Sequence, residues 1–254
     1  MRVAVISGAS SGMGREFVKM TAQRGGIDEI WVIARRKERL EALQTEVRVP
    51  LRLLPLDLTR EESYGEYSAL LERHKPDVAF LVNASGFGKF GRYDEIPLED
   101  SVNMIELNCK SMVRVTTLTL PYMKAGGRIV QVDSMSAFQP VPYMSIYGAT
   151  KAFVLSYARS LNVELRPRNI KVMAFCPYWV QTEFFDHAWE TSKTAVTNYN
   201  KIYTAEEVVR VAMRDSEKGR DVCVPGLSNK LQVVATKLLP HKLIMKIWMK
   251  QQKH

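Results

Sequence analysis

Cysteine is scarce in this chain of 254 residues, and its three cysteines are far apart. Cys109, Cys176 and Cys223 each lie within or beside an apolar segment. Disulfide frameworks and zinc sites need closely spaced cysteines, so neither is indicated. We therefore expect three buried thiols, no metal site and a reducing compartment.

Long apolar runs are also missing. No stretch approaches the roughly 20 apolar residues that span a bilayer. The first residues, Met1 to Ile6, lead directly into a glycine-rich turn and leave no room for the apolar stretch and cleavage site of a secretory signal. The sequence predicts a soluble, cytoplasmic protein.

Acidic residues are absent from the end of the chain. The formal net charge is +9, and from Val222 onward there are six lysines and no acid. A basic balance can indicate nucleic acid or an anionic membrane as partner. No helix-turn-helix, zinc or RNA-binding motif accompanies the charge here. We therefore expect no nucleic-acid partner.

The rest of the composition is that of an ordinary globular protein. Hydrophobic residues make up 46% and charged residues 25%, which argues against disorder and against a fibrous protein. No repeat, low-complexity tract or Gly/Ser-rich linker marks a boundary. We expect one domain over residues 1–254.

Short β-branched runs alternate with longer helical stretches. Such alternation is typical of βαβ units, whose parallel strands are covered on both faces. The predicted fold class is α/β, a single-domain doubly wound Rossmann fold with a seven-stranded parallel sheet and helices on both faces. The predicted strands are Val3 to Ile6, Glu29 to Ala34, Leu51 to Leu56, Val78 to Val82, Arg128 to Val132, Lys171 to Phe175 and Val222 to Val224.

Two helix starts carry the S/T-x-x-E spacing of a capping box. Thr59 is followed by Glu62, and Thr204 by Glu207. In a capping box the two side chains reciprocally satisfy backbone N–H groups at the helix start. The spacing predicts helices that begin just after Thr59 and Thr204.

A glycine-rich turn follows the first strand and opens a helix. Glycines at this turn allow backbone N–H groups and a helix N-terminus to approach a pyrophosphate. The spacing G-x-x-x-G-x-G resembles the turn of the short-chain dehydrogenase/reductase superfamily rather than the common G-x-G-x-x-G pattern. The predicted cofactor contacts in this turn are Gly8, Ser10, Ser11, Gly12, Met13 and Gly14.

The second predicted strand ends in Arg35 and Arg36. An acid at this position would bind the ribose 2′-hydroxyl of NAD, and none is present. Guanidinium groups pair instead with a 2′-phosphate, so we expect NADP(H) as cofactor. The alternative is that the two arginines only begin a solvated helix.

Tyr147 and Lys151 are four residues apart, on one face of a predicted helix. A phenol titrates near pH ~10, and a neighbouring ammonium is expected to lower its pKa. Ser134 lies at the end of the fifth strand, where open α/β sheets place their ligand crevice, and its hydroxyl can bond a substrate oxygen. These three residues predict a site for carbonyl reduction.

The superfamily resemblance extends from Val3 to about Val224, and it implies further roles. Asn108 matches the helix asparagine whose carbonyl holds a water beside Lys151, and Asp57 with Leu58 matches the adenine contact. Asp57 can also be read as an acid at a helix N-terminus. Asn83-Ala84-Ser85-Gly86 resembles the N-N-A-G turn but departs from it at Ala84 and Ser85. The resemblance implies that Asn83 and Ala84, and also Tyr147 and Lys151, contact the cofactor. The remaining implied nicotinamide contacts are Pro177, Val180 and Thr182, with Tyr178 in place of the family's glycine.

Position in the family also implies an apolar, sulfur-rich substrate pocket. Residues 183–203 are interpreted as a substrate lid, or alternatively as a surface helix pair with partly buried aromatics. Tyr178 either shapes the pocket, bonds a substrate oxygen or packs under the lid. The candidate pocket residues are Phe87, Met135, Phe138, Met144, Tyr178 and Phe184.

A basic, amphipathic extension covers residues 227–254. Three interpretations stay open: packing on its own or a neighbouring subunit, covering the pocket, or peripheral contact with a membrane through lysines near Trp248. It resembles the C-terminal extension of hydroxysteroid and long-chain ketoacyl reductases.

The residues together predict an NADP(H)-dependent oxidoreductase that interconverts a ketone and a secondary alcohol on an apolar substrate, hydroxysteroid-like or bile-acid-like in character. One alternative is a 3-oxoacyl or other carbonyl reductase, and another is a non-catalytic NADP(H)-binding sensor. The resemblance also implies a homodimer or homotetramer, paired through the helices near Val102 to Lys124 and Ser145 to Arg166.

Overall fold

The computed structural model describes residues 1–192 and 195–252. Seven apolar runs form one parallel sheet in the order β3-β2-β1-β4-β5-β6-β9, which confirms the predicted fold class and strand number. Burial on both faces explains why these runs are almost continuously apolar. The strands are β1 (Arg2–Ser7), β2 (Glu29–Ile33), β3 (Leu51–Leu54), β4 (Asp77–Asn83), β5 (Arg128–Val132), β6 (Lys171–Phe175) and β9 (Val222–Cys223).

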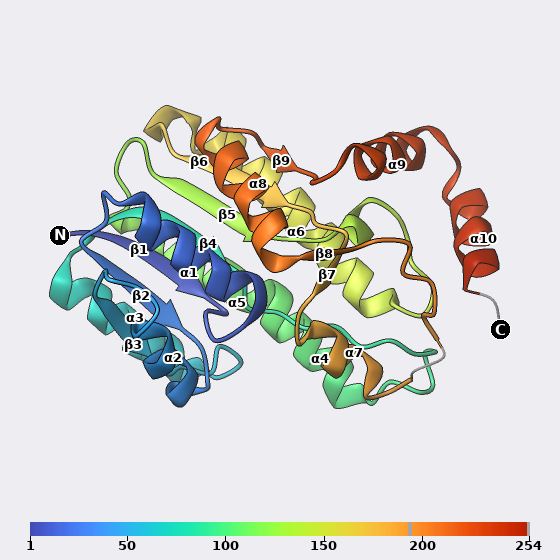
Figure 1. Cartoon of the computed structure of the whole chain (residues 1–254), viewed down its shortest axis with the longest axis horizontal. Helices are drawn as coiled ribbons and strands as arrows, with labels where there is room; N and C mark the ends of the chain where they lie inside the picture. The colour runs from blue at the N-terminus through green and yellow to red at the C-terminus, as the bar shows by residue number, and fades with distance from the viewer. Residues whose placement is uncertain (193–194, 253–254) are drawn as a thin grey trace.

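Helices cover both faces of this sheet (Figure 1). On one face, α1 (Gly12–Arg24), α2 (Lys37–Gln44) and α8 (Ala205–Glu217) bury their apolar sides. On the other, α3 (Glu61–His74), α5 (Ser111–Thr119) and α6 (Ser145–Glu164) do the same. The short helices are α4 (Leu98–Ile105), η1 (Glu106–Lys110), η2 (Leu120–Tyr122), η3 (Met135–Phe138), η4 (Arg166–Arg168) and α7 (Phe184–Trp189).

Strand order reverses between β1 and β4, and this reversal positions the site. Connections leave β1 and β4 in opposite directions along the sheet, so a crevice opens at their carboxyl ends. The glycine-rich turn after β1 and the Ala84-Ser85-Gly86 segment after β4 both lie at this edge. Ligand-binding residues from distant parts of the sequence therefore meet there.

A second, two-stranded parallel sheet was not predicted. It pairs β7 (Trp179–Gln181) with β8 (Ile202–Thr204). Each strand has three residues, too few for an alternating pattern to be recognised. This pairing joins the two ends of the segment 183–203, which we call the lid segment. Lys193 and Thr194 of that segment lie outside the described residues.

One of the two predicted capping boxes is correct. Thr204 Oγ1 accepts a hydrogen bond from Glu207 N at 3.2 Å, and Glu207 Oε2 accepts one from Thr204 N at 2.9 Å. The other is wrong, because α3 begins at Glu61. There Thr59 instead donates from its N–H and its hydroxyl to Asp57 Oδ1, at 3.0 and 2.8 Å. The local turn formed by Asp57 replaces the expected cap.

The end of the chain forms α9 (Leu227–Leu238) and α10 (His241–Gln251). Ile244 and Trp248 of α10 are buried, and Trp248 Nε1 donates to Pro142 O at 3.0 Å. Helix α10 therefore packs on its own subunit, and Gln232 and Trp248 of the extension also line the cavity described below, so the first two interpretations apply together. Lys253 and His254 of this extension lie outside the described residues. Among the helices that the structure describes, none is long and apolar enough to cross a membrane.

We expect Thr204→Ala to destabilise the protein by about 1 kcal/mol, because α8 loses its cap. For a chain of this size the melting temperature should fall by about 2–4 °C, measurable by calorimetry. Thr204→Ser keeps the hydroxyl and should restore most of the loss. An unchanged melting temperature in Thr204→Ala would contradict this role.

Candidate active site

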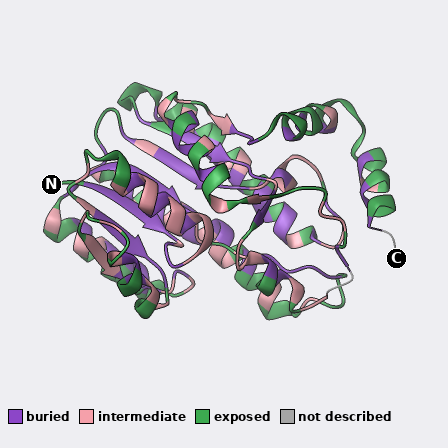
Figure 2. Ribbon diagram, in the orientation of Figure 1, coloured by how far each residue is buried: buried purple, intermediate pink, exposed green. Residues whose placement is uncertain are grey.

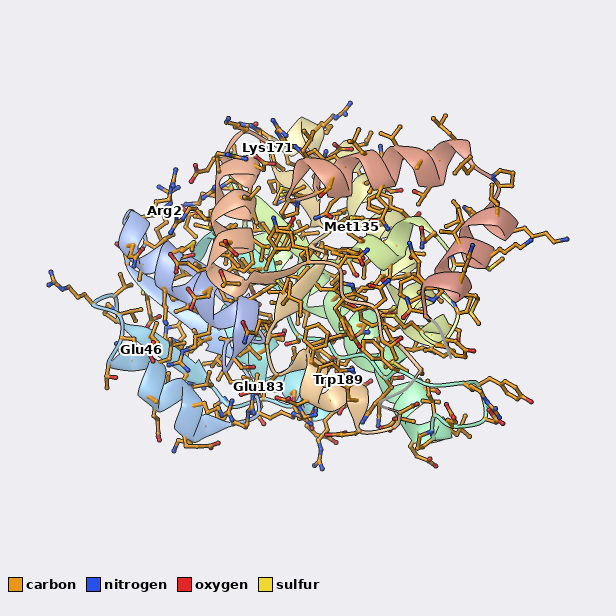
Figure 3. The ribbon with its side chains drawn as sticks, turned by 45° about the vertical axis from the view of Figure 1, so that its right-hand side comes forward. Arg2, Glu46, Met135, Lys171, Glu183 and Trp189 are labelled. Atoms are coloured by element: carbon orange, nitrogen blue, oxygen red, sulfur yellow. The ribbon has the colours of Figure 1, made fainter. Side chains whose placement is uncertain are left out.

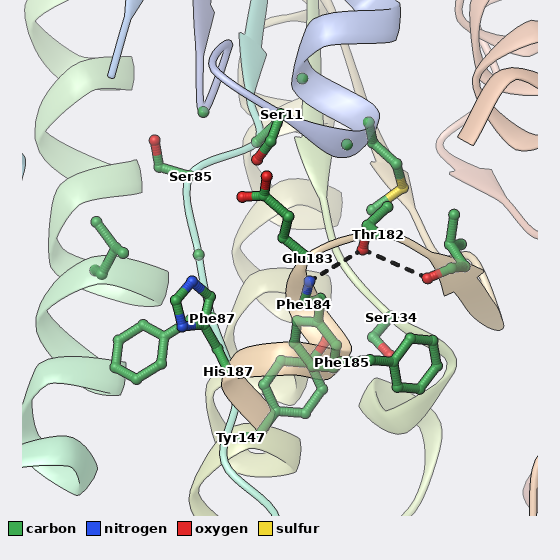
Figure 4. A pocket seen from close by; sticks show the side chains of 18 of the residues that line it. Ser11, Ser85, Phe87, Ser134, Tyr147, Thr182, Glu183, Phe184, Phe185 and His187 are labelled. Carbon is green, nitrogen blue, oxygen red and sulfur yellow. Dashed lines mark hydrogen bonds between the residues drawn. The ribbon is translucent and has the colours of Figure 1, made fainter. Parts of the chain in front are cut away.

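A cavity of about 600 Å³ lies at the carboxyl edge of the sheet. It extends from the glycine-rich turn after β1, past the ends of β4 and β5, to Trp248 of α10. Figure 4 shows the turn above, Tyr147 below, and the lid segment crossing between them. The cavity therefore connects the predicted cofactor residues with the predicted catalytic residues.

The glycine-rich turn is folded too tightly for side chains. Gly8 has φ +69°, and a Cβ there would lie 2.6 Å from the carbonyl carbon of Ala84. At Gly14 a Cβ would lie 2.1 Å from the carbonyl oxygen of Gly8. The first residues of α1 line the cavity, and the first turn of this helix carries no acid. This end of the cavity is consequently suited to an anion such as a pyrophosphate.

A cluster of arginines lies beside the turn. Arg36 Nη2 donates to Ser10 Oγ at 3.2 Å and to Ser11 Oγ at 3.3 Å. It also forms an ion pair with Glu183 of the lid segment at 2.8 Å, and Arg39 binds the same carboxylate. Burial opposes ionisation of Glu183, but hydrogen bonds from Arg39 and Arg36 outweigh it and lower its pKa. Sequence reasoning missed Glu183, which is far from the arginines in the chain.

Asp57 and Leu58 line the cavity next to the arginines, as the resemblance implied. Burial opposes ionisation of Asp57, but its two hydrogen bonds with Thr59 and the charge of Arg35 lower its pKa. Asp57 is therefore a fixed acceptor at the wall of the cavity. Its oxygens hold the turn before α3, which agrees with the alternative reading of Asp57 as a helix-start acid.

Tyr147 and Lys151 lie on the same face of α6. The Nζ atom of Lys151 is 5.6 Å from the centre of the Tyr147 ring and donates to Val132 O at 2.9 Å. Tyr147 lines the cavity, together with Ser134 at the end of β5. Lys151 is buried behind them and does not belong to the lining. Tyr147 and Ser134 thus lie side by side in the cavity wall, and the Lys151 ammonium lies behind them, out of contact with the cavity.

The electrostatics of Tyr147 differ from the expectation. Burial raises the pKa of its phenol, and a hydrogen bond with Ser134 only partly opposes this. The predicted net lowering by Lys151 is therefore wrong for this structure. Lys151 is itself buried, so its own pKa is lowered, and its ammonium is directed toward the Val132 carbonyl.

Asp133 is a functional candidate that sequence reasoning missed. It lines the cavity and is 2% exposed, and its Oδ1 atom has no hydrogen-bond partner among the described residues. Its Oδ2 accepts from Cys176 Sγ at 3.5 Å. Burial raises the pKa of Asp133, and the charge of Lys151 opposes that rise. The signal in the sequence was an acid placed directly after a strand of apolar character and directly before Ser134.

Asn108 lies in a π-helical turn, η1, between α4 and α5. Its side chain accepts from Phe87 N at 3.0 Å and donates to Phe87 O at 2.9 Å and to Thr150 Oγ1 at 3.1 Å. It therefore fastens the segment after β4 to α6. Single π-helical turns within helices are frequent at functional sites.

Most predicted cofactor residues line the cavity, but Asn83 and Lys151 do not. The side chain of Asn83 is buried and donates to Thr116 and Gln131, at 3.0 and 2.8 Å. Asn83 thus stabilises the sheet. The predicted residues in the lining are Gly8, Ser10, Ser11, Gly12, Met13, Gly14, Arg35, Arg36, Asp57, Leu58, Ala84, Tyr147, Pro177, Val180 and Thr182.

The substrate end of the cavity is apolar and aromatic. Five of the six predicted pocket residues line it: Phe87, Met135, Met144, Tyr178 and Phe184. Phe138 does not, because it packs against the core beneath η3. Sequence reasoning did not assign to the pocket several residues that line the cavity: Trp179, which lies within the motif segment between Tyr178 and Val180, and Val141, Phe185, Gln232 and Trp248, which lie outside it.

The lid segment contributes Phe184 and Phe185 to the lining of the cavity, and its described part carries the short helix α7. Figure 3 marks the two ends of the helical stretch at Glu183 and Trp189. The rings of Phe185, Trp189 and Tyr199 pack together, and Trp189 Nε1 donates to Tyr199 Oη at 2.8 Å. Phe184 approaches Tyr147, with ring centres 5.3 Å apart. The alternative of a surface helix pair is not seen in the described part of the segment.

Comparison with known proteins places this site in a family. The family model described as short chain dehydrogenase matches residues 2–193. The chain therefore belongs to the short-chain dehydrogenase family and is an oxidoreductase of that family.

Individual relatives support the same placement. The chain is 28% identical to 17-beta-hydroxysteroid dehydrogenase type 3 of Mus musculus over 87% of its length and 70% of that protein. It is 30% identical to the very-long-chain 3-oxoacyl-CoA reductase of Bos taurus over 71% of its length and 60% of that protein. A short-chain dehydrogenase from Sphingobium yanoikuyae in complex with NADPH is 29% identical, with a TM-score of 0.78 over 94% of each chain.

Replacing the buried carboxylate should change the pH dependence of turnover. Burial lowers the pKa of Lys151 and Asp133 opposes that change. Asp133→Asn should therefore let Lys151 lose its proton at a lower pH, and the high-pH limb of the kcat profile should move to lower pH. The profile is measured by nicotinamide absorbance with a substrate that the unmodified protein turns over.

A matched control is Asp100→Asn, which also removes a cavity-lining carboxylate but one paired with Lys89. The high-pH limb of the kcat profile of Asp100→Asn should not move. If Asp133→Asn left the high-pH limb unmoved, the carboxylate would not act on Lys151.

Proposed function

We propose that the protein is an NADP(H)-dependent oxidoreductase that interconverts a ketone and a secondary alcohol on an apolar substrate of steroid or bile-acid character. The observation that carries this proposal is one continuous cavity. At one end are a helix N-terminus and arginines, and at the other are Tyr147 and Ser134 among aromatic rings.

The residues present fit a nicotinamide dinucleotide. The turn around Gly8 and Gly14 leaves no room for side chains, and Arg36 with the hydroxyls of Ser10 and Ser11 offers donors for phosphate. The remaining holders would be the cofactor residues already described in the lining. When bound, this cofactor supplies or accepts a hydride.

Tyr147 and Ser134 would act on the substrate oxygen. The Ser134 hydroxyl would donate a hydrogen bond that orients the carbonyl oxygen, and Tyr147 would donate the proton that converts it into an alcohol. Because burial raises the pKa of Tyr147, the phenol stays protonated at neutral pH, which suits a proton donor. In the reverse direction a Tyr147 phenolate would take the proton, and the buried charge of Lys151 would stabilise that anion.

The choice of NADP(H) over NAD(H) rests on the arginines and not on family membership. Arg35 and Arg36 line the cavity where an acid would bind the 2′-hydroxyl of NAD. In the structure the Arg36 guanidinium is paired with Glu183. A 2′-phosphate would replace this carboxylate as the partner of Arg36, an exchange of one anion for a more highly charged one.

The apolar substrate class rests on the lining of the substrate end. Phe184, Trp179 and Trp248 offer large aromatic surfaces, while Met135 and Met144 can adapt to different shapes. The similarity to a hydroxysteroid dehydrogenase favours a steroid-like ketone. A second candidate is a long-chain 3-oxoacyl thioester, favoured by the similarity to a very-long-chain 3-oxoacyl-CoA reductase.

We also propose a homodimer or homotetramer in a reducing compartment such as the cytoplasm. Val102 and Ile105 of α4 and Phe153 and Val163 of α6 are exposed apolar residues on the helices predicted to pair. The cysteines of the described chain are free and buried, which fits such a compartment.

Tyr147→Phe should lower kcat by at least about 100-fold, because the ring stays and only the proton donor is lost. Turnover is followed by NADPH absorbance over a panel of steroid ketones, bile-acid ketones and 3-oxoacyl thioesters. NADPH binding, followed by fluorescence titration, should persist. Tyr157→Phe makes the same change on α6 outside the cavity and should leave turnover intact. Retained activity in Tyr147→Phe would reject the catalytic assignment.

Arg36→Ala should raise the Kd for NADPH about tenfold or more, because a charged hydrogen bond to the 2′-phosphate is lost. The Kd for NADH should change little, since NADH carries no phosphate there. Both constants are measured by fluorescence titration. Arg48→Ala, an exposed arginine outside the cavity, serves as control. Equal losses for NADH and NADPH would refute the proposed discrimination.

A further inference from the structure

The apolar face of helix α9 is turned to solvent, whereas a helix packed on a protein core normally buries its apolar face. Leu227, Leu231, Val234 and Leu238 are spaced so that they share one face of the helix, and that face is exposed. Leu227 and Leu238 are 75% and 77% exposed. The face buried against the protein carries Asn229, Val233 and Thr236, of which one is apolar.

The exposed apolar surface continues onto α10. Leu243 and Ile247 lie one turn apart and are exposed, while Ile244 and Trp248 on the other side of the helix are buried. Figure 2 shows α9 largely in the exposed colour and α10 with its buried residues on one side. We call the set of six exposed residues, Leu227, Leu231, Val234, Leu238, Leu243 and Ile247, the outer apolar stripe.

Lysines flank this stripe. All five lysines of the described part of the two helices are exposed, and none forms a salt bridge with a described residue. No acid occurs from Val222 to the end of the chain. The surface therefore combines an apolar centre with a purely cationic border. The five lysines are Lys230, Lys237, Lys242, Lys246 and Lys250.

We propose that the outer apolar stripe docks on an anionic lipid surface. Leucine, valine and isoleucine side chains would enter the boundary between headgroups and acyl chains, and the lysines would pair with anionic headgroups. Lysine stems can extend along an apolar face while their ammonium groups stay with the headgroups. The apolar stripe and the flanking lysines thus both point to an anionic membrane as the partner.

Charge argues against a second copy of the chain as the occupant. A two-fold contact through the stripe would bring the same patch of each copy together. Each patch carries lysines and no acid, so the contact would place cations against cations. An anionic membrane removes this repulsion.

The stripe lies next to the cavity, so membrane docking would also bear on how an apolar substrate reaches the site, and this part of the inference rests on the proposed function. Gln232 of α9 and Trp248 of α10 line the cavity, and α9 packs against η3, which follows Ser134. Gln252, just after α10, accepts hydrogen bonds from Thr197 N and Asn198 N of the lid segment, at 2.9 and 3.1 Å. The two helices that form the stripe thus also form a wall of the cavity. An apolar ketone dissolved in the membrane would lie close to the site that reduces it.

Vesicle flotation of the full-length protein tests this proposal. Phosphatidylcholine vesicles are compared with vesicles in which about three in ten lipids are phosphatidylglycerol. The bound fraction should be higher on the anionic vesicles and should fall as salt is raised. The double variant Leu231→Glu with Leu238→Glu should bind at least about tenfold more weakly, because it places acids within the stripe. Binding is measured without substrate or cofactor, so its outcome does not depend on the proposed catalytic activity.

Leu98→Glu is the matched control, since Leu98 of α4 is 74% exposed and lies outside the stripe. It should bind the vesicles as the unmodified protein does, and circular dichroism should show that every variant is folded. Absence of binding to anionic vesicles would overturn the proposal. So would light scattering that shows self-association abolished by the stripe variant without any vesicle binding, because a second copy would then cover the stripe.

Discussion

The burial of charge behind Tyr147 is the constraint on which the site depends. Lys151 and Asp133 lie at the carboxyl edge of the sheet, both almost removed from water. Each opposes the effect of burial on the pKa of the other. Such a pair is stable only if surrounding segments hold it in place, and here the Val132 carbonyl, Cys176 and the packed helix α6 do so. Tyr147 and Asp133 line the cavity, and Lys151 is buried behind this lining.

Much of the fold was predictable because burial on both faces imposes short, nearly continuous apolar runs on parallel strands. All seven strands of the main sheet were identified, with ends displaced by at most two residues. The pairing of β7 with β8 was not, since three residues carry no pattern. The failed cap at Thr59 has a local cause: Asp57 Oδ1 accepts from the Thr59 backbone N–H, which the Glu62 carboxylate would have bonded in a capping box. A side-chain pattern cannot rank two such competitors for a single donor.

The residues of the site likewise fall into those that the sequence could predict and those that it could not. The glycine-rich turn, Ser134 and Tyr147 stand in motifs of fixed spacing at strand and helix ends, so their place at the cavity could be predicted from the sequence. Residues that meet the cavity through tertiary packing, such as Glu183 and Trp248, have no such spacing. The sign of the pKa change at Tyr147 was missed for a related reason. Spacing along a helix shows that an ammonium is near, but it does not show how much water has been removed.

Three consecutive residues of the chain reach three parts of the site. Thr182 borders Gly12 of the phosphate turn, Glu183 binds Arg36, and Phe184 lies against the Tyr147 ring. The peptide links between them are too short for one residue to shift without moving the next. The phosphate turn, the arginine cluster and the Tyr147 ring are therefore linked through one short stretch of backbone. A substitution at Arg36 that releases Glu183 is thus expected to be felt at Phe184, the next residue along the chain.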